Sequence, residues 1–379
     1  MIYLDNAATS FPKAPGVAEA VARQLAEGGG SAGRAGHAFA LDASRVLFEA
    51  REELARILGL PDARRLVFCK SATEALNLAL LGALPAGGTV AASDLEHNSV
   101  MRPLRHLESS RGLRILVFGC DAAGNPRPGE LEAALAAKPD LLVATAASNV
   151  TGALLPIGEI ALACRKAGVP ICVDGSQITG HAPIDVEGLG IDYFCFSGHK
   201  GLLGPGGTGG LCLGPGTGPE PLLRGGTGSA SESEEQPVDL PDRYEAGTQN
   251  VSGLAGLLAA ARFLEAMGLE KVRIRERAIT DRLVRGLAGL KGVALHGPPA
   301  GISRAPIVSL SAPGIDLGEL ARALDGRGVA ARAGLHCAPA AHRSIGTFVL
   351  GGSLRLSPGF FTTEAEVDET LRIMEELTG

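Results

Sequence analysis

Lys200 stands shortly after a hydrophobic run, Ile191 to Phe196, that is typical of a buried strand. Ser-Gly-His separates the two, and a glycine-rich stretch begins at Gly201. A lysine at the mouth of a buried strand is uncommon unless it has a partner or a chemical role. Burial disfavours the ammonium form and lowers the lysine pKa, which favours formation of a Schiff base. An ordinary exposed lysine in a turn explains this segment equally well.

A carboxylate takes the corresponding place after the preceding expected strand. The apolar segment that begins at Val169 ends in Asp174, and ligands of open α/β sheets bind at the carboxyl ends of the strands. A carboxylate there suits a protonated pyridine nitrogen, and a nearby lysine suits an aldehyde. Together they indicate pyridoxal phosphate, whose ring needs a cationic nitrogen to act as an electron sink. The alternative is that Asp174 caps the following segment.

These two motifs carry a resemblance to a known family. The segments Asp174–Gln177 (Asp-Gly-Ser-Gln) and Ser197–Lys200 (Ser-Gly-His-Lys) resemble those of the class V aminotransferase superfamily of pyridoxal-phosphate enzymes. Within it the chain is similar to the cysteine desulfurases and selenocysteine lyases. The likeness runs from Tyr3–Ala8 (Tyr-Leu-Asp-Asn-Ala-Ala) to Arg355 and beyond, so it covers nearly the whole chain.

The order of the expected elements indicates an α/β protein. Helical or polar stretches separate most of the apolar strand candidates, which predicts a mainly parallel sheet covered on both faces. The last two candidates are close in sequence, so we expect one antiparallel edge. The resemblance implies the type I fold of pyridoxal-phosphate-dependent transferases, with a seven-stranded sheet. The expected strands are residues 65–69, 89–93, 113–118, 140–146, 169–174, 191–197 and 209–213.

The length of 379 residues predicts two domains, because it exceeds a single compact core. We expect a large cofactor-binding domain over 1–250 and a smaller α/β domain over 251–379, with residues 1 to about 15 packed on the smaller one. The polar segment 224–243 is expected to be a loop. In the C-terminal part, helices are expected at 253–267 and 272–290, and strands at 293–296, 307–311, 329–332 and 353–357.

Composition and charge exclude several classes of function. The net charge is −6 and no dense run of Lys and Arg is present, which argues against nucleic-acid binding. No apolar run is long enough to span a membrane, and the N-terminus does not read as a signal peptide. The 7 cysteines are odd in number and irregularly spaced, which argues against a disulfide framework. We therefore expect a cytoplasmic enzyme.

A candidate phosphate site follows the strand expected at 65–69. The pattern Ser71-Ala-Thr-Glu74 is typical of a capping box, and a helix N-terminus is a ready anion site. A cofactor phosphate could rest on the amides near Ala72 and on the Thr73 hydroxyl, although a simple helix cap fits equally well. The resemblance implies phosphate binding by Thr73 and adds three contacts: Ser197, His199 and, reaching the neighbouring subunit of a homodimer, Thr248. Helix capping is the alternative for Thr248.

The resemblance also implies roles for three residues around the cofactor ring. His97 would lie flat on the pyridine ring, whereas a lone histidine in a loop is otherwise more often simply solvated. Asn149 would lie near the ring oxygen and the substrate, and Gln177 would hydrogen-bond the ring hydroxyl. Each of the first two follows an expected strand, as Lys200 and Asp174 do.

Arg355 is the candidate for binding the substrate's α-carboxylate. It lies in a strictly alternating segment, 353–357, whose leucines face one side while Arg355 and its serines face the other. A guanidinium offers a planar fork that a carboxylate accepts with both oxygens. A structural salt bridge is the alternative, and the family-like motif favours binding.

Cys337 differs from the other cysteines because a glycine, Gly334, precedes it and a proline, Pro339, follows it. This pattern predicts a loop with an accessible thiol, while the other cysteines look like small buried hydrophobes. Three basic residues lie close to it in sequence, namely Arg332, His336 and His342. Their positive charge would lower the thiol pKa from about 8.5 towards neutrality.

The loop around Cys337 resembles the short Arg-x-Gly-x-His-Cys loop of the second group of desulfurases. Leu335 departs from it, because many members of that group carry histidine at this position. An inert surface cysteine is one alternative. A zinc site is another, but His336, Cys337 and His342 lack regular spacing and a fourth ligand, so no metal is expected.

The resemblance implies a homodimeric enzyme that converts L-cysteine to L-alanine, with Lys200 and His97 at the catalytic centre and a persulfide formed on Cys337. A sulfur-acceptor protein, as in iron–sulfur cluster assembly, is the implied partner. The alternatives are a selenocysteine lyase acting on L-selenocysteine, another class V lyase or epimerase, or a catalytically silent cofactor-binding protein that handles sulfur. The presence of Lys200, Asp174 and Cys337 argues against the silent protein.

Overall fold

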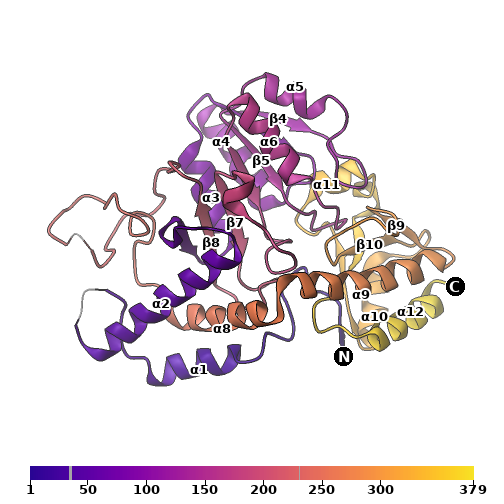
Figure 1. Ribbon diagram of the computed structural model, residues 1–379. Helices are drawn as coiled ribbons and strands as arrows, with labels where there is room; N and C mark the ends of the chain where they lie inside the picture. The colour runs from indigo at the N-terminus through magenta and orange to yellow at the C-terminus, as the bar shows by residue number, and fades with distance from the viewer. Residues whose placement is uncertain (34–35, 230) are drawn as a thin grey trace.

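One mixed sheet of seven strands forms the centre of the computed structural model, which describes residues 1–33, 36–229 and 231–379 (Figure 1). Neighbouring strands are parallel except at β8, which runs antiparallel to both β2 and β7. The expected mainly parallel α/β sheet is confirmed. The antiparallel strand was expected at an edge of the sheet, but β8 lies between β2 and β7, and β2 forms the edge. In spatial order the strands are β2 (Leu66–Cys69), β8 (Gly209–Leu213), β7 (Tyr193–Ser197), β6 (Ile171–Asp174), β5 (Leu141–Thr145), β3 (Thr89–Ser93) and β4 (Arg114–Phe118).

Both faces of this sheet are apolar because its inner strands are hydrophobic at successive positions. In β5, for example, Leu142 and Ala144 face one core, and Leu141 and Val143 face the other. Helices cover both sides (Figure 1). The first core includes side chains of α2 (Ala38–Ile57), α5 (Glu130–Ala136), α6 (Ile157–Ala167) and α8 (Val251–Met267); the second includes those of α3 (Ala72–Ala83) and α4 (Asn98–Arg111). Two further α-helices of this part of the chain are α1 (Val17–Glu27) and α7 (Val186–Leu189).

A second, antiparallel sheet of four strands lies in the C-terminal part of the chain. Its apolar face packs on three helices, so Leu354 and Leu356 are fully buried while Arg355 points to the opposite face. The strands in order are β12 (Arg332–Gly334), β13 (Ser353–Leu356), β10 (Val308–Ser311) and β9 (Ala294–His296), and the helices are α9 (Leu269–Gly289), α10 (Leu317–Gly326) and α12 (Glu364–Thr378).

The single strand expected at 329–332 is wrong. The chain instead forms β11 (Val329–Ala330), which pairs with β1 (Ile2–Tyr3), and then β12, which pairs with β13. The reason lies far away in sequence, because the N-terminus supplies a partner for the first half of the segment. The polar segment 224–243 contains no helix or strand in the residues described, as expected; Ala230 lies outside them.

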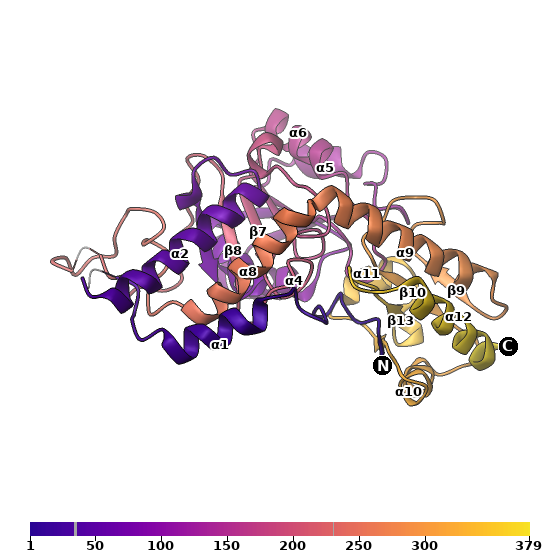
Figure 2. The same cartoon turned by 60° about the horizontal axis from the view of Figure 1, so that its bottom comes forward.

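The N-terminal segment connects the two sheets. Its Leu4 is buried in the core of the C-terminal part, and Asn6 Nδ2 donates to the Ser357 carbonyl at 3.1 Å. Farther on, the Ala14 amide donates to the Leu203 carbonyl at 3.1 Å, beyond the end of β7. In Figure 2 this stretch runs from α1 towards the C-terminal elements. The division into domains at residue 250 stays a prediction.

Helices α8 and α9 follow one another with a sharp bend. Across the described ranges no single helix is both long and apolar enough to cross a bilayer, and α8 with α9 meets that test only as a pair bent by 84°. Nine residues of α8 are buried, which is what a core helix of this composition requires.

Candidate active site

Lys200 lies in the turn that follows β7, beside the end of β6. The two strands are parallel and in register, with Asp174 opposite Cys195, so the turn after Ser197 lies close to the Asp174 carboxylate. Burial is the largest influence on Lys200 and lowers its pKa; the Asp174 charge opposes this, the Arg355 charge lowers the pKa further, and a charge on Cys337 raises it. The amine of Lys200 therefore lies near a carboxylate, a guanidinium and a thiol, and its pKa is lowered.

Asp174 is the last residue of β6 and is 4% exposed. Its Oδ1 accepts from the Ser176 amide at 2.9 Å, so the Asx-type turn that the sequence left open is present. The carboxylate also acts on groups that are distant in sequence, since its charge acts to raise the pKa of both Lys200 and His97. Capping a turn and serving as a charged partner are thus compatible roles for Asp174.

His97 is the N-cap of α4 and is held in a defined tautomer. Its Nδ1 accepts from the Ser99 amide at 3.0 Å, and because an amide can only donate, the ring proton must lie on Nε2. Burial lowers the pKa of His97 to about 4, so the ring is neutral near pH 7. The Ser99 hydroxyl lies 2.8 Å from Nδ1 and 3.0 Å from Thr73 Oγ1. Ser99 thereby links His97 to the candidate phosphate residue.

The start of α3 is built partly as expected. The Ser71 hydroxyl accepts from the Glu74 amide at 3.3 Å. Glu74 Oε2, however, accepts from the backbone amide of Lys70 and not from that of Ser71, so the expected capping box is only half formed. The Ala72 amide donates to Ser197 Oγ at 3.2 Å, across the sheet. The Ser197 hydroxyl therefore lies at the first turn of α3, where a helix N-terminus attracts an anion.

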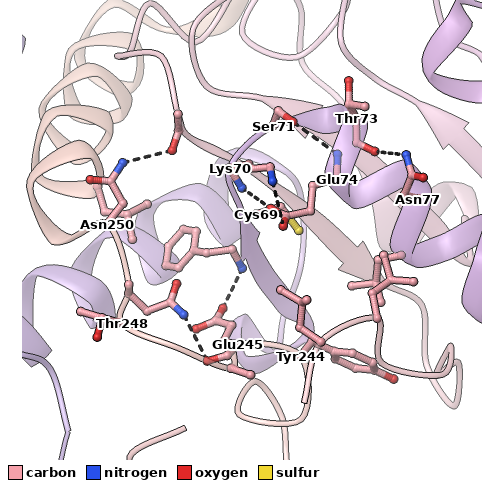
Figure 3. A pocket seen from close by; sticks show the side chains of 18 residues that line it. Cys69, Lys70, Ser71, Thr73, Glu74, Asn77, Tyr244, Glu245, Thr248 and Asn250 are labelled. Carbon is pink, nitrogen blue, oxygen red and sulfur yellow. Dashed lines mark hydrogen bonds and ion pairs between the residues drawn. The ribbon is translucent and has the colours of Figure 1, made fainter. Parts of the chain in front are cut away.

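A cavity of about 490 Å³ lies beside this helix start (Figure 3). Thr73 lies on one side of the cavity and Thr248 on another. Lys200 and Asp174 are not among the described residues that line it. Glu245 anchors the segment that carries Thr248, because its carboxylate pairs with Arg51 at 2.7 Å and accepts from the Phe68 amide at 2.7 Å. Thr248 thus faces the same cavity as Thr73, with its side chain exposed.

The substrate-side residues form a connected group. Arg355 Nη1 donates to the Asn149 carbonyl at 3.0 Å, and Asn149 Nδ2 donates to the His336 carbonyl at 2.7 Å. Arg355 Nη2 contacts Asp5 Oδ1 at 2.8 Å, so the alternative role of Arg355, a structural salt bridge, is present. Its Nε is buried and has no hydrogen-bond partner among the described residues. The Asp5 pair therefore orients the guanidinium without using all of its donors.

Gln177 also contacts the N-terminal segment. Its Nε2 donates to the Ala7 carbonyl at 3.0 Å, and the side chain is 3% exposed. His199 directly precedes Lys200. Its pKa is lowered to about 4 by burial and by the charges of Lys200 and Lys13. The contacts of both residues to a cofactor stay predictions.

Cys337 is the exposed cysteine of a tight turn after β12, as expected. His336 and Cys337 both adopt left-handed backbone conformations, with φ of 46° and 56°, which cost free energy in residues other than glycine. The Cys337 carbonyl accepts from the Asn98 amide at 2.8 Å. This contact fixes the turn to the start of α4, immediately beside His97.

The expectation that charged histidines surround Cys337 is wrong. Burial lowers the pKa of His336 to about 3 and that of His342 to about 4, so both rings are neutral near pH 7. His336 Nε2 instead contacts the Ser353 carbonyl at 3.0 Å, and Arg332 is paired with Asp5 at 2.9 Å. Residue type predicted basicity here, whereas burial decides the charge.

Glu96 was not singled out from the sequence, although it directly precedes His97. Its side chain is fully buried, and Oε1 accepts from the Thr145 amide at 2.7 Å and from the Ser93 hydroxyl. Oε2 is buried without a hydrogen-bond partner among the described residues. Burial, reinforced by the Asp174 charge, raises the pKa of Glu96 to about 8. A protonated carboxyl group thus joins the ends of β3 and β5 beneath the candidate site.

The raised pKa of Glu96 predicts a pH dependence of stability. The folded protein holds a proton that the unfolded chain releases near its ordinary value of 4.5, so stability from this group is complete at lower pH and is lost as the pH rises towards about 8. Glu96→Gln cannot ionise, so its urea midpoint should fall less between pH 5 and pH 8 than that of the wild type.

The exposed Glu132→Gln in α5 is the matched control and should follow the wild-type curve. Parallel curves for Glu96→Gln and the wild type would mean that Glu96 is already ionised in the folded protein.

Comparison with known proteins gives a consistent result. The family model for aminotransferase class-V matches residues 2–370. A probable cysteine desulfurase of Methanothermobacter thermautotrophicus is 32% identical, over 100% of this chain and 95% of its own length. One of Mycolicibacterium paratuberculosis is 33% identical over 100% of this chain, which spans only 55% of that relative. The apo structure of a cysteine desulfurase from Thermococcus onnurineus superposes with a TM-score of 0.93 at 30% identity, covering 100% of this chain and 94% of that one.

The type I fold implied by the sequence motifs is confirmed by this structural similarity. Enzymes of this family generally depend on pyridoxal phosphate. The family match and the whole-chain relatives confirm the resemblance seen in the motifs around Asp174 and Lys200: this chain belongs to the class V aminotransferase family.

Proposed function

We propose that this protein is a pyridoxal-phosphate-dependent cysteine desulfurase that converts L-cysteine to L-alanine and retains the sulfur as a persulfide on Cys337. The observation that carries the proposal is the meeting of a buried amine, Lys200, with an exposed thiol, Cys337, close enough for the thiolate charge to raise the lysine pKa. The relatives named as cysteine desulfurases support the same reaction.

The residues present fit pyridoxal phosphate. The lowered pKa of Lys200 favours the amine form that reacts with an aldehyde, and the buried Asp174 is the carboxylate that would pair with a protonated ring nitrogen. When bound, the cofactor would supply the electron sink for the carbanion formed at the substrate Cα. The residues that would hold it are Ala72, Thr73, His97, Asn149, Asp174, Gln177, Ser197, His199 and Lys200, with Thr248 of a second subunit.

Arg355 would bind the substrate carboxylate and thereby place the Cα near Lys200. The arginine is 2% exposed and oriented by Asp5 and the Asn149 carbonyl, so little conformational freedom is lost when a carboxylate binds. Lys200, whose pKa is lowered by burial, can in its free-amine form accept the α-proton and hold it as an ammonium.

Cys337 would act as the nucleophile towards sulfur. Its thiolate forms an S–S bond with the substrate sulfur while the bond between that sulfur and the substrate Cβ breaks. The bonding electrons leave with the carbon, which takes up a proton and becomes the methyl group of alanine. Before this attack the negative charge of a Cys337 thiolate raises the pKa of Lys200, so the thiolate favours the ammonium form that holds the α-proton.

The proposal includes a homodimer, because Thr248 would complete the phosphate site of a second subunit. The side chains of Phe39, Leu41 and Phe48 on α2 are more than half exposed, which suits a protein interface. We also propose a cytoplasmic location, since all 7 cysteines are free, as in a reducing compartment. The exposed Cys337 persulfide would pass its sulfur to an acceptor protein.

Arg355→Ala should weaken cysteine binding and leave cofactor loading intact. Loss of a hydrogen-bonded charge pair costs about 1.5–3 kcal/mol, which corresponds to an increase in KM of roughly tenfold to a hundredfold. Arg355→Lys should restore little of this, because an ammonium cannot form the two-pronged contact. Steady-state kinetics and cofactor absorbance measure the two quantities; a wild-type KM in both variants would make Arg355 purely structural.

Cys337→Ser should abolish the enzyme persulfide while the protein still folds and binds cofactor. The site is exposed, so the substitution should change stability by no more than about 0.5 kcal/mol, and a serine hydroxyl stays protonated near neutral pH. Alanine release from cysteine and persulfide labelling are the measurements. Cys164→Ser on α6 is the control, because serine can bond the preceding helical turn; wild-type alanine and persulfide in Cys337→Ser would reject the proposal.

A further inference from the structure

Four donors converge on one carbonyl oxygen, that of His199. The Ser10 amide lies 2.9 Å from it, the Ser10 hydroxyl 3.1 Å, the Thr9 hydroxyl 3.2 Å and Lys13 Nζ 3.1 Å. A carbonyl oxygen has two lone pairs, so this one is contacted beyond its ordinary capacity. The peptide bond that carries it leads directly into Lys200.

Lys13 is committed entirely to this contact. Its ammonium donates to the His199 carbonyl, to Ser10 Oγ at 3.0 Å and to Thr9 Oγ1 at 3.2 Å, which accounts for all three of its N–H groups. The side chain is half-buried, and burial lowers its pKa to about 8, so it is mainly a cation near pH 7. A lysine with no free donor is placed to hold the backbone and has none left for a ligand.

The turn that Lys13 contacts is held on both sides of His199 by backbone hydrogen bonds, from the Gly198 amide to the Thr208 carbonyl at 2.9 Å and from the Leu203 amide to the Lys200 carbonyl at 2.8 Å. The His199 carbonyl between them is held by the N-terminal segment. Gly198 and Gly201 flank Lys200 on either side, and neither has a side chain to pack. A Cβ at Gly198 would meet Thr208 Oγ1 at 2.2 Å, and one at Gly201 would meet His181 at 2.5 Å. The close approach requires glycine at both positions, and the cost is a backbone that can move unless something outside the turn restrains it.

The N-terminal segment that carries Lys13 also contacts other residues of the candidate site. The segment that carries Lys13 also accepts from Gln177 at the Ala7 carbonyl and pairs with Arg355 through Asp5. Residues 5–13 therefore contact three parts of the candidate site: the His199 peptide that precedes Lys200, Gln177 and Arg355.

We propose that Lys13 is a positioning residue whose ammonium, by holding the His199 carbonyl, fixes the backbone from which the Lys200 side chain reaches the cofactor. The inference rests on the proposed role of Lys200. The Lys200 side chain starts from this backbone, so a shift of the peptide would displace the point from which Nζ reaches the cofactor. The hydrogen bond from Lys13 to the His199 carbonyl prevents that shift, and the Lys13 charge does not contact the cofactor itself.

Lys13→Met tests this in the cofactor-loaded protein, with Lys166→Met on the exposed side of α6 as matched control. The readouts are the dissociation constant for pyridoxal phosphate and the visible circular dichroism of the bound cofactor, which reports ring orientation in the folded molecules. Losing a charged hydrogen bond should weaken cofactor binding about tenfold or more. The dichroic band should fall to about half or less if the ring is no longer held in one orientation, with Lys166→Met unchanged.

Thr9→Val is the milder variant and covers the case in which Lys13→Met does not fold. It removes one hydroxyl from the cluster and should weaken cofactor binding by roughly threefold, as the loss of one neutral hydrogen bond does. Folded variants with wild-type dissociation constants and dichroism would overturn the inference. Failure of the wild type itself to form a borohydride-reducible bond at Lys200 would instead overturn the proposed function.

Discussion

The candidate site depends on the burial of the Lys200 amine beside opposing charges, which together lower its pKa. Desolvation alone would favour the neutral amine, and the Arg355 charge acts in the same direction, while Asp174 restores part of the affinity for a proton. A lysine in this balance can give up its proton to react with an aldehyde and can later take one from carbon. The parallel register of β6 and β7 sets the balance, because it fixes the carboxylate beside the turn that carries the lysine.

The site is assembled from parts of the chain that are far apart in sequence. The central sheet supplies the lysine and the acid, the antiparallel sheet supplies Arg355 from β13 and the thiol from the turn after β12, and the N-terminal segment contacts both. Buried polar groups have to be paired where these parts meet. Asp5 shows the result, because one carboxylate pairs with Arg355 and with Arg332. The arginine proposed to bind the substrate is therefore also part of the contact between the N-terminal segment and the antiparallel sheet.

The sequence was informative where the signal was local. Apolar runs located all seven strands of the central sheet, and Asp174, Asn149 and Lys200 were recognisable as polar residues directly after such runs. The alternation at 353–357 correctly placed Arg355 opposite the buried leucines. The family motifs then assigned roles that residue types alone left open, as for His97 and Thr73.

What could not be predicted depends on the surroundings in space. Burial makes His336 and His342 neutral and protonates Glu96, and burial is a property of the assembled fold. The break between β11 and β12 has its cause in the pairing of β11 with the N-terminus, over three hundred residues earlier. The contact between Lys13 and the His199 carbonyl spans 186 positions and leaves no local pattern.

The most direct measurement is borohydride reduction of the cofactor-loaded protein followed by peptide mass spectrometry. The proposed site predicts one pyridoxyl-phosphate adduct, on Lys200, and none on Lys13, although burial lowers the pKa of both amines. Lys13 should stay unmodified because all its N–H groups are occupied. An adduct on Lys13, or no adduct on Lys200 in a protein that retains its cofactor, would contradict the assignment of the site.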